Sequence, residues 1–169
     1  MSDSFVFEFP LQTSPEEESL CNKRFYAGSN LYNACLGEAL RRLDLARESK
    51  DWSRAKKLPR SKERTAYFQK ALKRHHFFEY SLHVFVKNLV NDSWIKDHID
   101  SQVAQKIATR AFHSAHEYMT GKRGRPRFKN PRQFSSLEGK SNLTGIRFKN
   151  GKIFWNRLLL KPLYDPKDK

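Results

Sequence analysis

The stretch Ile146–Trp155 (IRFKNGKIFW) decides the fold class of this 169-residue chain. Two short strand-like runs flank the pair Asn150-Gly151, and an Asn-Gly pair in that position is the strongest short-range signal of a β-hairpin. The run Leu158-Leu159-Leu160 predicts one more strand before Pro162. The C-terminal part of the chain is therefore expected to form a small antiparallel sheet.

A further strand is predicted at the N-terminus, where Phe5, Phe7 and Phe9 alternate with other residues before Pro10. This period of two is typical of a half-buried strand. A single strand is not stable by itself, and the only other strand-like sequence lies near the C-terminus. We therefore expect the two ends of the chain to share one sheet.

The residues between these ends have helical patterns. Ser14-Pro15 followed by Glu17 forms a capping box, which predicts a helix start, and apolar residues recur at helical spacing as far as Glu48. Gly28 and Gly37 weaken this helix and indicate close packing against another helix.

Residues 51–60 read as an exposed basic connection, after which helical spacing resumes at Lys62 and continues to Leu89. A break at residues 91–93 precedes a helix that starts at Asp100-Ser101 and stops at Gly121. The prediction is an α+β protein, with a helical domain at 13–121 inserted into a β domain made of 1–12 and 122–169.

The formal net charge of +15, from 33 Lys and Arg against 18 Asp and Glu, is unevenly distributed. Residues 121–169 hold 14 basic and 3 acidic residues, and residues 122–132 hold six basic residues and no acid. We interpret this block, which includes Phe128, as a polyanion site in preference to a solvated loop that only aids solubility. For the second basic segment, residues 54–64, a polyanion site and a helix flank that only faces water are equally good explanations.

Other features exclude several classes of protein. No apolar run approaches the roughly 18 residues of a membrane span, and the N-terminus lacks a signal-peptide pattern, so we expect a cytoplasmic protein. On one helix Cys21 and Cys35 would lie about 21 Å apart, which predicts free thiols, and the absence of a C-x-x-C pair excludes a zinc ribbon.

Catalytic and metal-binding motifs are also missing. The chain has no Gly-rich phosphate loop, no G-x-S-x-G elbow and no H-E-x-x-H motif. His75, Glu79 and His83 share one helix face, but we favour ordinary helix packing over a metal site there. We therefore predict no catalytic residues, no metal and no cofactor, and a chain that acts as a binder.

Three motifs in order carry a family resemblance: Leu31–Leu36 (LYNACL), Ser101–Gln105 (SQVAQ) and, most specific, Gly124–Lys129 (GRPRFK), which precedes the hairpin. With the N-terminal strand, this order resembles the N-terminal half of TnpB proteins, which are transposon-encoded RNA-guided DNA endonucleases related to the type V CRISPR effectors. The resemblance covers nearly the whole chain. It implies a small split β-barrel, called the wedge domain, with an inserted helical recognition domain.

The resemblance also implies two ligands, a structured guide-type RNA and target DNA. By this resemblance and the charge pattern, the RNA-binding candidates are Lys122, Arg123, Arg125, Arg127, Phe128, Lys129, Arg132, Arg147, Lys149 and Lys152. The candidates for DNA or heteroduplex binding are Arg54, Lys56, Lys57, Arg60, Lys62, Arg64, Tyr80, Ser81, Ser101 and Gln105.

In the family a RuvC-like nuclease domain and a zinc ribbon follow the wedge domain, about where this sequence stops at Lys169. We therefore expect a nucleic-acid-binding module that does not cleave by itself. Two alternatives stay open: half of a split nuclease completed by a separate RuvC-like chain, or a DNA-binding regulator that needs no RNA.

Overall fold

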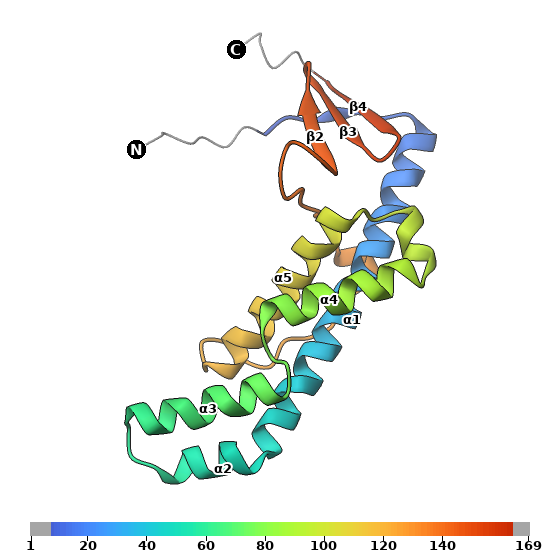
Figure 1. Ribbon diagram of the computed structural model, residues 1–169. Coiled ribbons are helices and arrows are strands. Elements are labelled where there is room, and N and C mark those ends of the chain that lie inside the picture. The colour runs from blue at the N-terminus through green and yellow to red at the C-terminus, as the bar shows by residue number, and fades with distance from the viewer. Residues whose placement is uncertain (1–7, 164–169) are drawn as a thin grey trace, which may run out of the picture.

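The computed structural model describes residues 8–163 and combines five α-helices with a four-stranded antiparallel sheet. In chain order the elements are β1 (Leu11–Gln12), α1 (Pro15–Glu48), α2 (Lys50–Lys57), α3 (Lys62–Arg74), α4 (Glu79–Asn91), the 3-10 helix η1 (Trp94–Asp97), α5 (Ser101–Met119), the 3-10 helix η2 (Pro131–Gln133), β2 (Ile146–Lys149), β3 (Lys152–Trp155) and β4 (Leu158–Pro162). The sheet lies at one end of the molecule and the α2–α3 hairpin at the other (Figure 1). The predicted α+β class is confirmed.

Helix α1 is the axis of the molecule and connects these two ends. Its start is the predicted capping box: the Ser14 hydroxyl accepts from the Glu17 amide at 3.2 Å, and the Glu17 carboxylate accepts from the Ser14 amide at 2.8 Å. With 34 residues at a rise of about 1.5 Å each, α1 is roughly 51 Å long.

The hydrophobic core lies between α1, α4 and α5. The buried side chains of α1 and α5 include several alanines beside larger aliphatic residues, and those of α4 are Leu82, Val86 and Val90. The buried face of α5 includes Val103, Ile107, Ala111 and Ala115, and the helix is followed by Gly121 with a φ of +74°. The predicted start and end of this helix are therefore confirmed.

Two helix predictions were wrong. Residues 51–60 were expected to be an exposed connection, but residues 51–57 belong to α2, which begins where the Ser49 hydroxyl accepts from the Trp52 amide at 3.3 Å. The helical pattern from Lys62 to Leu89 is not continuous, because the chain turns between α3 and α4 at His76, whose φ is +54°. The α2–α3 hairpin is held by an aromatic contact between its two helices, with the ring centroids of Trp52 and Phe68 4.6 Å apart.

The sheet has the strand order β1-β4-β3-β2, so the N-terminal segment pairs with the C-terminal strands as predicted. The strand lies at Leu11–Gln12, whereas the predicted Phe5–Phe9 strand falls mostly on residues 1–7, outside the described residues. Strands β2 and β3 pair around Asn150-Gly151, both with positive φ, as expected for a type I′ hairpin. Within residues 8–163, β1 and β2 do not pair, and the sheet is open.

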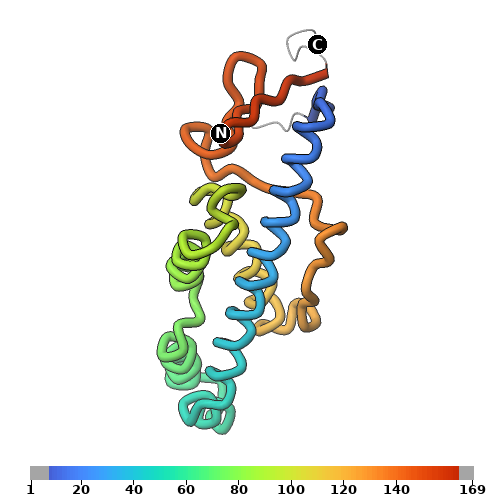
Figure 2. Tube along the Cα trace, turned by 90° about the vertical axis from the view of Figure 1, so that its right-hand side faces the viewer, coloured from blue at the N-terminus to red at the C-terminus, as the bar shows by residue number. Residues whose placement is uncertain are grey.

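The segment between α5 and β2 returns along α1. We call residues 122–139 the strap. Figure 2 shows it beside α1, on the side away from α3 and α4. A Cβ atom on Gly28 would lie 2.8 Å from Leu137 and 2.9 Å from Phe134, and one on Gly37 would lie 3.8 Å from Phe128. The Gly28 Cβ would also lie 3.7 Å from Ile107 of α5, so the predicted packing against another helix holds at Gly28, where the strap approaches more closely still, whereas Gly37 faces only the strap.

Both cysteines are free thiols, as predicted. Cys35 is buried in the core, where desolvation raises its pKa to about 12. None of the described helices has the length and apolar character needed to cross a bilayer.

Candidate nucleic-acid interface

The strap is attached to α1 mainly by neutral contacts. The Asn33 side-chain amide forms two hydrogen bonds with the Lys129 backbone: its Nδ2 donates to the carbonyl at 2.9 Å, and its Oδ1 accepts from the amide at 2.8 Å. Phe134 is buried, with its ring centroid 6.0 Å from that of Tyr32. At Lys129 and Phe134 the strap is thus positioned by neutral side chains.

The six basic side chains of residues 122–132 fall into two groups. Arg123 forms an ion pair with Glu117 at 3.1 Å, and Arg125 forms one with Asp44 at 3.0 Å. The others are exposed and have no ion-pair partner among residues 8–163; they are Lys122, Arg127, Lys129 and Arg132. These four cations are available to a polyanion.

Arg125 also belongs to a stack on α5. The Tyr118 ring lies near two guanidinium groups, with Arg47 at 4.7 Å and Arg125 at 5.7 Å from its centroid. Hydrogen bonds from Arg47, then from Arg125, lower the pKa of the Tyr118 hydroxyl. Arg125, predicted from the sequence to bind RNA, is thus also a structural link between the strap, α1 and α5.

The sheet presents a basic outer face. Register places Arg147, Phe154 and Leu159 in one row across β2, β3 and β4, while the rows that include Trp155, Leu158 and Leu160 point to the core. The Arg147 guanidinium lies 5.9 Å from the Phe154 ring centroid. The cations on this face are Arg147, Lys149, Lys152 and Lys161. Among them Lys161 was missed by the sequence analysis, because its side depends on the register of β4.

One buried cation joins the sheet to the helices. Arg24 is 2% exposed, and its two terminal nitrogens donate to the carbonyls of Trp155 and Asn156, each at 2.6 Å. Its guanidinium also lies 4.5 Å from the Trp155 ring centroid. Desolvation lowers the pKa of Arg24, and Asp100 opposes this shift. Sequence analysis missed this residue, since its partners lie about 130 positions away.

The second basic region is the α2–α3 hairpin, residues 50–74, with ten basic and two acidic residues. Here cations pack on aromatic rings: Arg54 lies 4.6 Å from the Tyr67 centroid and Arg64 lies 5.6 Å from that of Phe68. Lys56, Lys57, Arg60 and Lys62 surround the exposed turn between the two helices and have no ion-pair partner in the described chain.

The four remaining candidates for DNA or heteroduplex binding differ in whether their side chains are free to contact a ligand. Tyr80 is one of the most exposed aromatic side chains of the described residues, at 71%. The Ser81 hydroxyl is already engaged by the carbonyls of His76 and Phe78 and by Arg42. Ser101 is exposed at the start of α5, and Gln105 accepts from Lys140 at 2.8 Å. Of these four, only Tyr80 and Ser101 present an unengaged side chain.

Glu79 and His83 lie 3.6 Å apart, as part of a hydrogen-bond network between α4 and α5. The Thr109 hydroxyl donates to Glu79 at 2.6 Å, so it accepts from His83 Nε2 at 2.9 Å. His113 approaches the same carboxylate at 4.0 Å. Among residues 8–163 no group of three or more His, Cys, Asp or Glu side chains is arranged to hold a metal ion.

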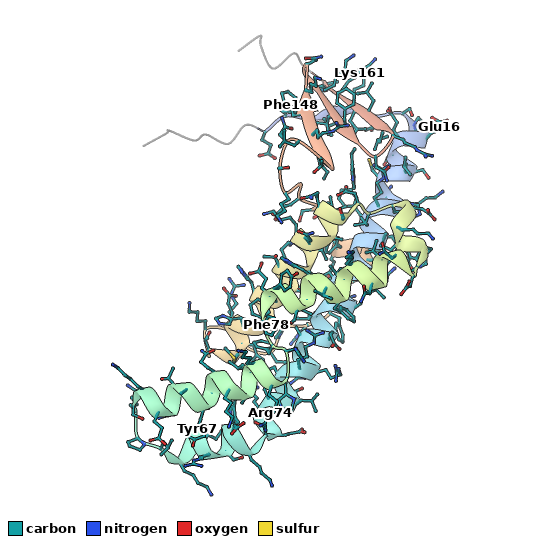
Figure 3. All side chains as sticks on the ribbon, viewed as in Figure 1. Glu16, Tyr67, Arg74, Phe78, Phe148 and Lys161 are labelled. Carbon is teal, nitrogen blue, oxygen red and sulfur yellow. The ribbon has the colours of Figure 1, made fainter. Side chains whose placement is uncertain are left out.

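The candidates therefore do not form a single patch. Figure 3 labels Phe148 and Lys161 at the sheet end and Tyr67 and Arg74 at the hairpin end. The strap lies between them, beside α1 (Figure 2). A polyanion that contacted all three regions would need to extend over roughly the length of α1.

Comparisons with known proteins add no relative: no family model, curated protein or solved structure matches this chain.

Proposed function

We propose that this chain is a nucleic-acid-binding module similar to the wedge and recognition portion of TnpB-like proteins. It binds structured guide-type RNA through the strap and the basic sheet face, and target DNA through the helical part. In this proposal the open sheet belongs to a small split barrel, and cleavage requires a RuvC-like nuclease domain in addition to the residues described here.

The observation that carries the proposal is the set of unpaired cations on the strap. Asn33 and Phe134 already attach this segment to α1, so Lys122, Arg127 and Lys129 are not needed to hold it. Keeping several like charges close together on a rigid backbone is unfavourable in the absence of a polyanion.

The basic sheet face supports the same conclusion. It combines cations with an aromatic ring, as at Arg147 and Phe154, and this combination suits a phosphate backbone together with stacked bases. Lys149 and Lys152 are directly opposite one another in the register, where two like charges repel unless an anion lies between them.

Two fourfold variants with equal reduction of charge test the proposal. The strap variant carries Lys122→Gln, Arg127→Gln, Lys129→Gln and Arg132→Gln, and the hairpin variant carries Lys56→Gln, Lys57→Gln, Arg60→Gln and Lys62→Gln. The probe is RNA transcribed from the adjoining transposon end, compared with random RNA of equal length in gel shifts at several salt concentrations. We expect a preference for the structured RNA, and for the strap variant a log-log salt slope that is shallower by about 0.9 for each phosphate that the variant no longer neutralises.

The hairpin variant should keep most of its RNA affinity and bind duplex DNA more weakly. An equal reduction of RNA affinity in both variants, or no preference for the structured RNA, would refute the guide-RNA assignment. Tight sequence-specific footprints on duplex DNA without RNA would instead indicate the DNA-binding regulator. A neighbouring reading frame that encodes the nuclease carboxylates would favour the split nuclease.

A further inference from the structure

A groove of about 390 Å³ lies between the C-terminal half of α1 and the strap. Its apolar part is formed by Leu40, Leu45 and Phe128, and its charged part includes Asp44, Glu48 and Arg125. It differs from the basic surfaces around it because both signs of charge are present. A site for phosphate alone would not be expected to contain two carboxylates.

Phe128 offers a surface for stacking. Its ring packs near Gly37, yet 62% of the residue is exposed. Leaving so large an apolar ring exposed beside a groove is unfavourable in water. Stacking of a nucleobase on such a ring is sequence-tolerant and contributes to the binding of single strands.

The cations that line the groove already have partners. Arg125 is paired with Asp44 at 3.0 Å, and Arg41 holds both oxygens of Glu38 at 2.8 Å. The strap cations without partners, such as Arg127, lie outside the residues that line the groove. Phosphate binding is therefore better assigned to the strap than to the groove itself.

Glu48 is the group without a partner. It is exposed and forms no ion pair or hydrogen bond within residues 8–163. It is also the last residue of α1, where the helix dipole disfavours a negative charge. This position gives no stabilisation to the helix, and a carboxylate there can accept hydrogen bonds from a ligand.

We propose that the groove binds one unpaired guanine of the RNA, stacked on Phe128 and hydrogen-bonded to Glu48. This inference rests on the proposed function. Guanine has two adjacent donors, N1–H and the N2 amino group, that match the two oxygens of a carboxylate. Adenine and cytosine offer an amino group beside an acceptor, and uracil offers one N–H. The base must be unpaired, because pairing occupies the same edge.

Fluorescence anisotropy with labelled hexanucleotides tests this site. Each probe contains five uridines and one guanosine, adenosine or inosine at the same position, and inosine differs from guanosine only by the missing N2 amino group. We expect the guanosine probe to bind about fivefold to a hundredfold more tightly than the adenosine probe, with inosine between them.

Three variants separate the contacts. Glu48→Gln should remove most of the preference for guanosine over inosine, whereas Glu63→Gln, the same change on the exposed face of α3, should retain it. Phe128→Leu should weaken binding of all three probes by a similar factor. Circular dichroism checks that each variant is folded.

The outcomes distinguish the two proposals. Equal affinity for the three probes, with structured RNA still bound, would overturn the guanine site and leave the proposed function standing. A preference for guanosine that is unchanged in Glu48→Gln would also overturn the site. Failure to bind any RNA would overturn both.

Discussion

The strap and the α2–α3 hairpin are both strongly basic, but they use their cations differently. In the hairpin, Arg54 and Arg64 pack on Tyr67 and Phe68, so these two charges are part of the fold, while the cations around its turn have no ion-pair partner in the described chain. In the strap, Asn33 and buried Phe134 provide much of the attachment, and four of the six cations between residues 122 and 132 have no ion-pair partner in the described chain. Basic composition alone therefore does not identify a binding surface. The contacts of each cation do.

The largest expected effect comes from removing the apolar attachment of the strap. Phe134→Ala should lower the free energy of unfolding by about 3–5 kcal/mol, because it deletes a buried ring and leaves a cavity. Urea denaturation measures this change. Limited digestion with trypsin should cut this variant first within residues 122–132.

Trp52→Ala is the matched variant in the hairpin, where the indole packs edge-on against Phe68 at 4.6 Å. It should expose residues 54–64 to trypsin and leave the strap protected. If either variant opened both regions equally, the two would not be separate local units.

A pair of glycine variants gives a smaller effect of opposite sign. Gly28→Ala should destabilise by about 1–3 kcal/mol, because its Cβ would lie within 2.9 Å of Leu137 and Phe134. Gly37→Ala should stabilise by up to about 1 kcal/mol, because alanine favours the helix and the Cβ would meet Phe128 at an ordinary 3.8 Å. Thermal unfolding of both variants tests whether the strap packs more tightly at Gly28, and two shifts of the same sign would contradict this.

The smallest effect is electrostatic and arises where the strap meets α1 and α5. Hydrogen bonds from Arg47 and Arg125 lower the pKa of Tyr118, so its phenolate is favoured in the folded state. The resulting stabilisation is present above the pKa of an unfolded tyrosine and disappears as the pH falls through the lowered folded pKa. An ultraviolet titration should show one early-ionising tyrosine, and Arg125→Gln should move that ionisation to higher pH. An unchanged titration would mean that Arg125 does not contact the hydroxyl.

The elements that could be predicted have local causes. The capping box at Ser14, the Asp100 cap of α5 and the type I′ turn at Asn150-Gly151 each depend on residues within a few positions of one another. Helix α2 was missed because the basic composition of residues 51–60 suggested a loop. Its Trp52 is stabilised by Phe68, and no local pattern shows that contact.

The candidate site was predictable as a composition but not as a geometry. The sequence identified the basic block and its charge, yet it could not tell that Arg125 is paired with Asp44 while Arg127 has no ion-pair partner within residues 8–163. The groove at Phe128 and Glu48 was missed entirely, since it exists only where the strap meets α1.

The sequence by itself therefore determined where most helices and strands begin and end, and how much positive charge each segment carries. Those properties follow from short-range backbone preferences and from a count of side chains. Only the tertiary structure decided which cations are paired, that Arg24 joins the sheet to α1, and that two glycines of α1 receive the strap. The physical reason is that ion pairs and close contacts depend on distances of a few ångströms between residues far apart in the chain, and these distances are set only when the helices and the sheet have packed together.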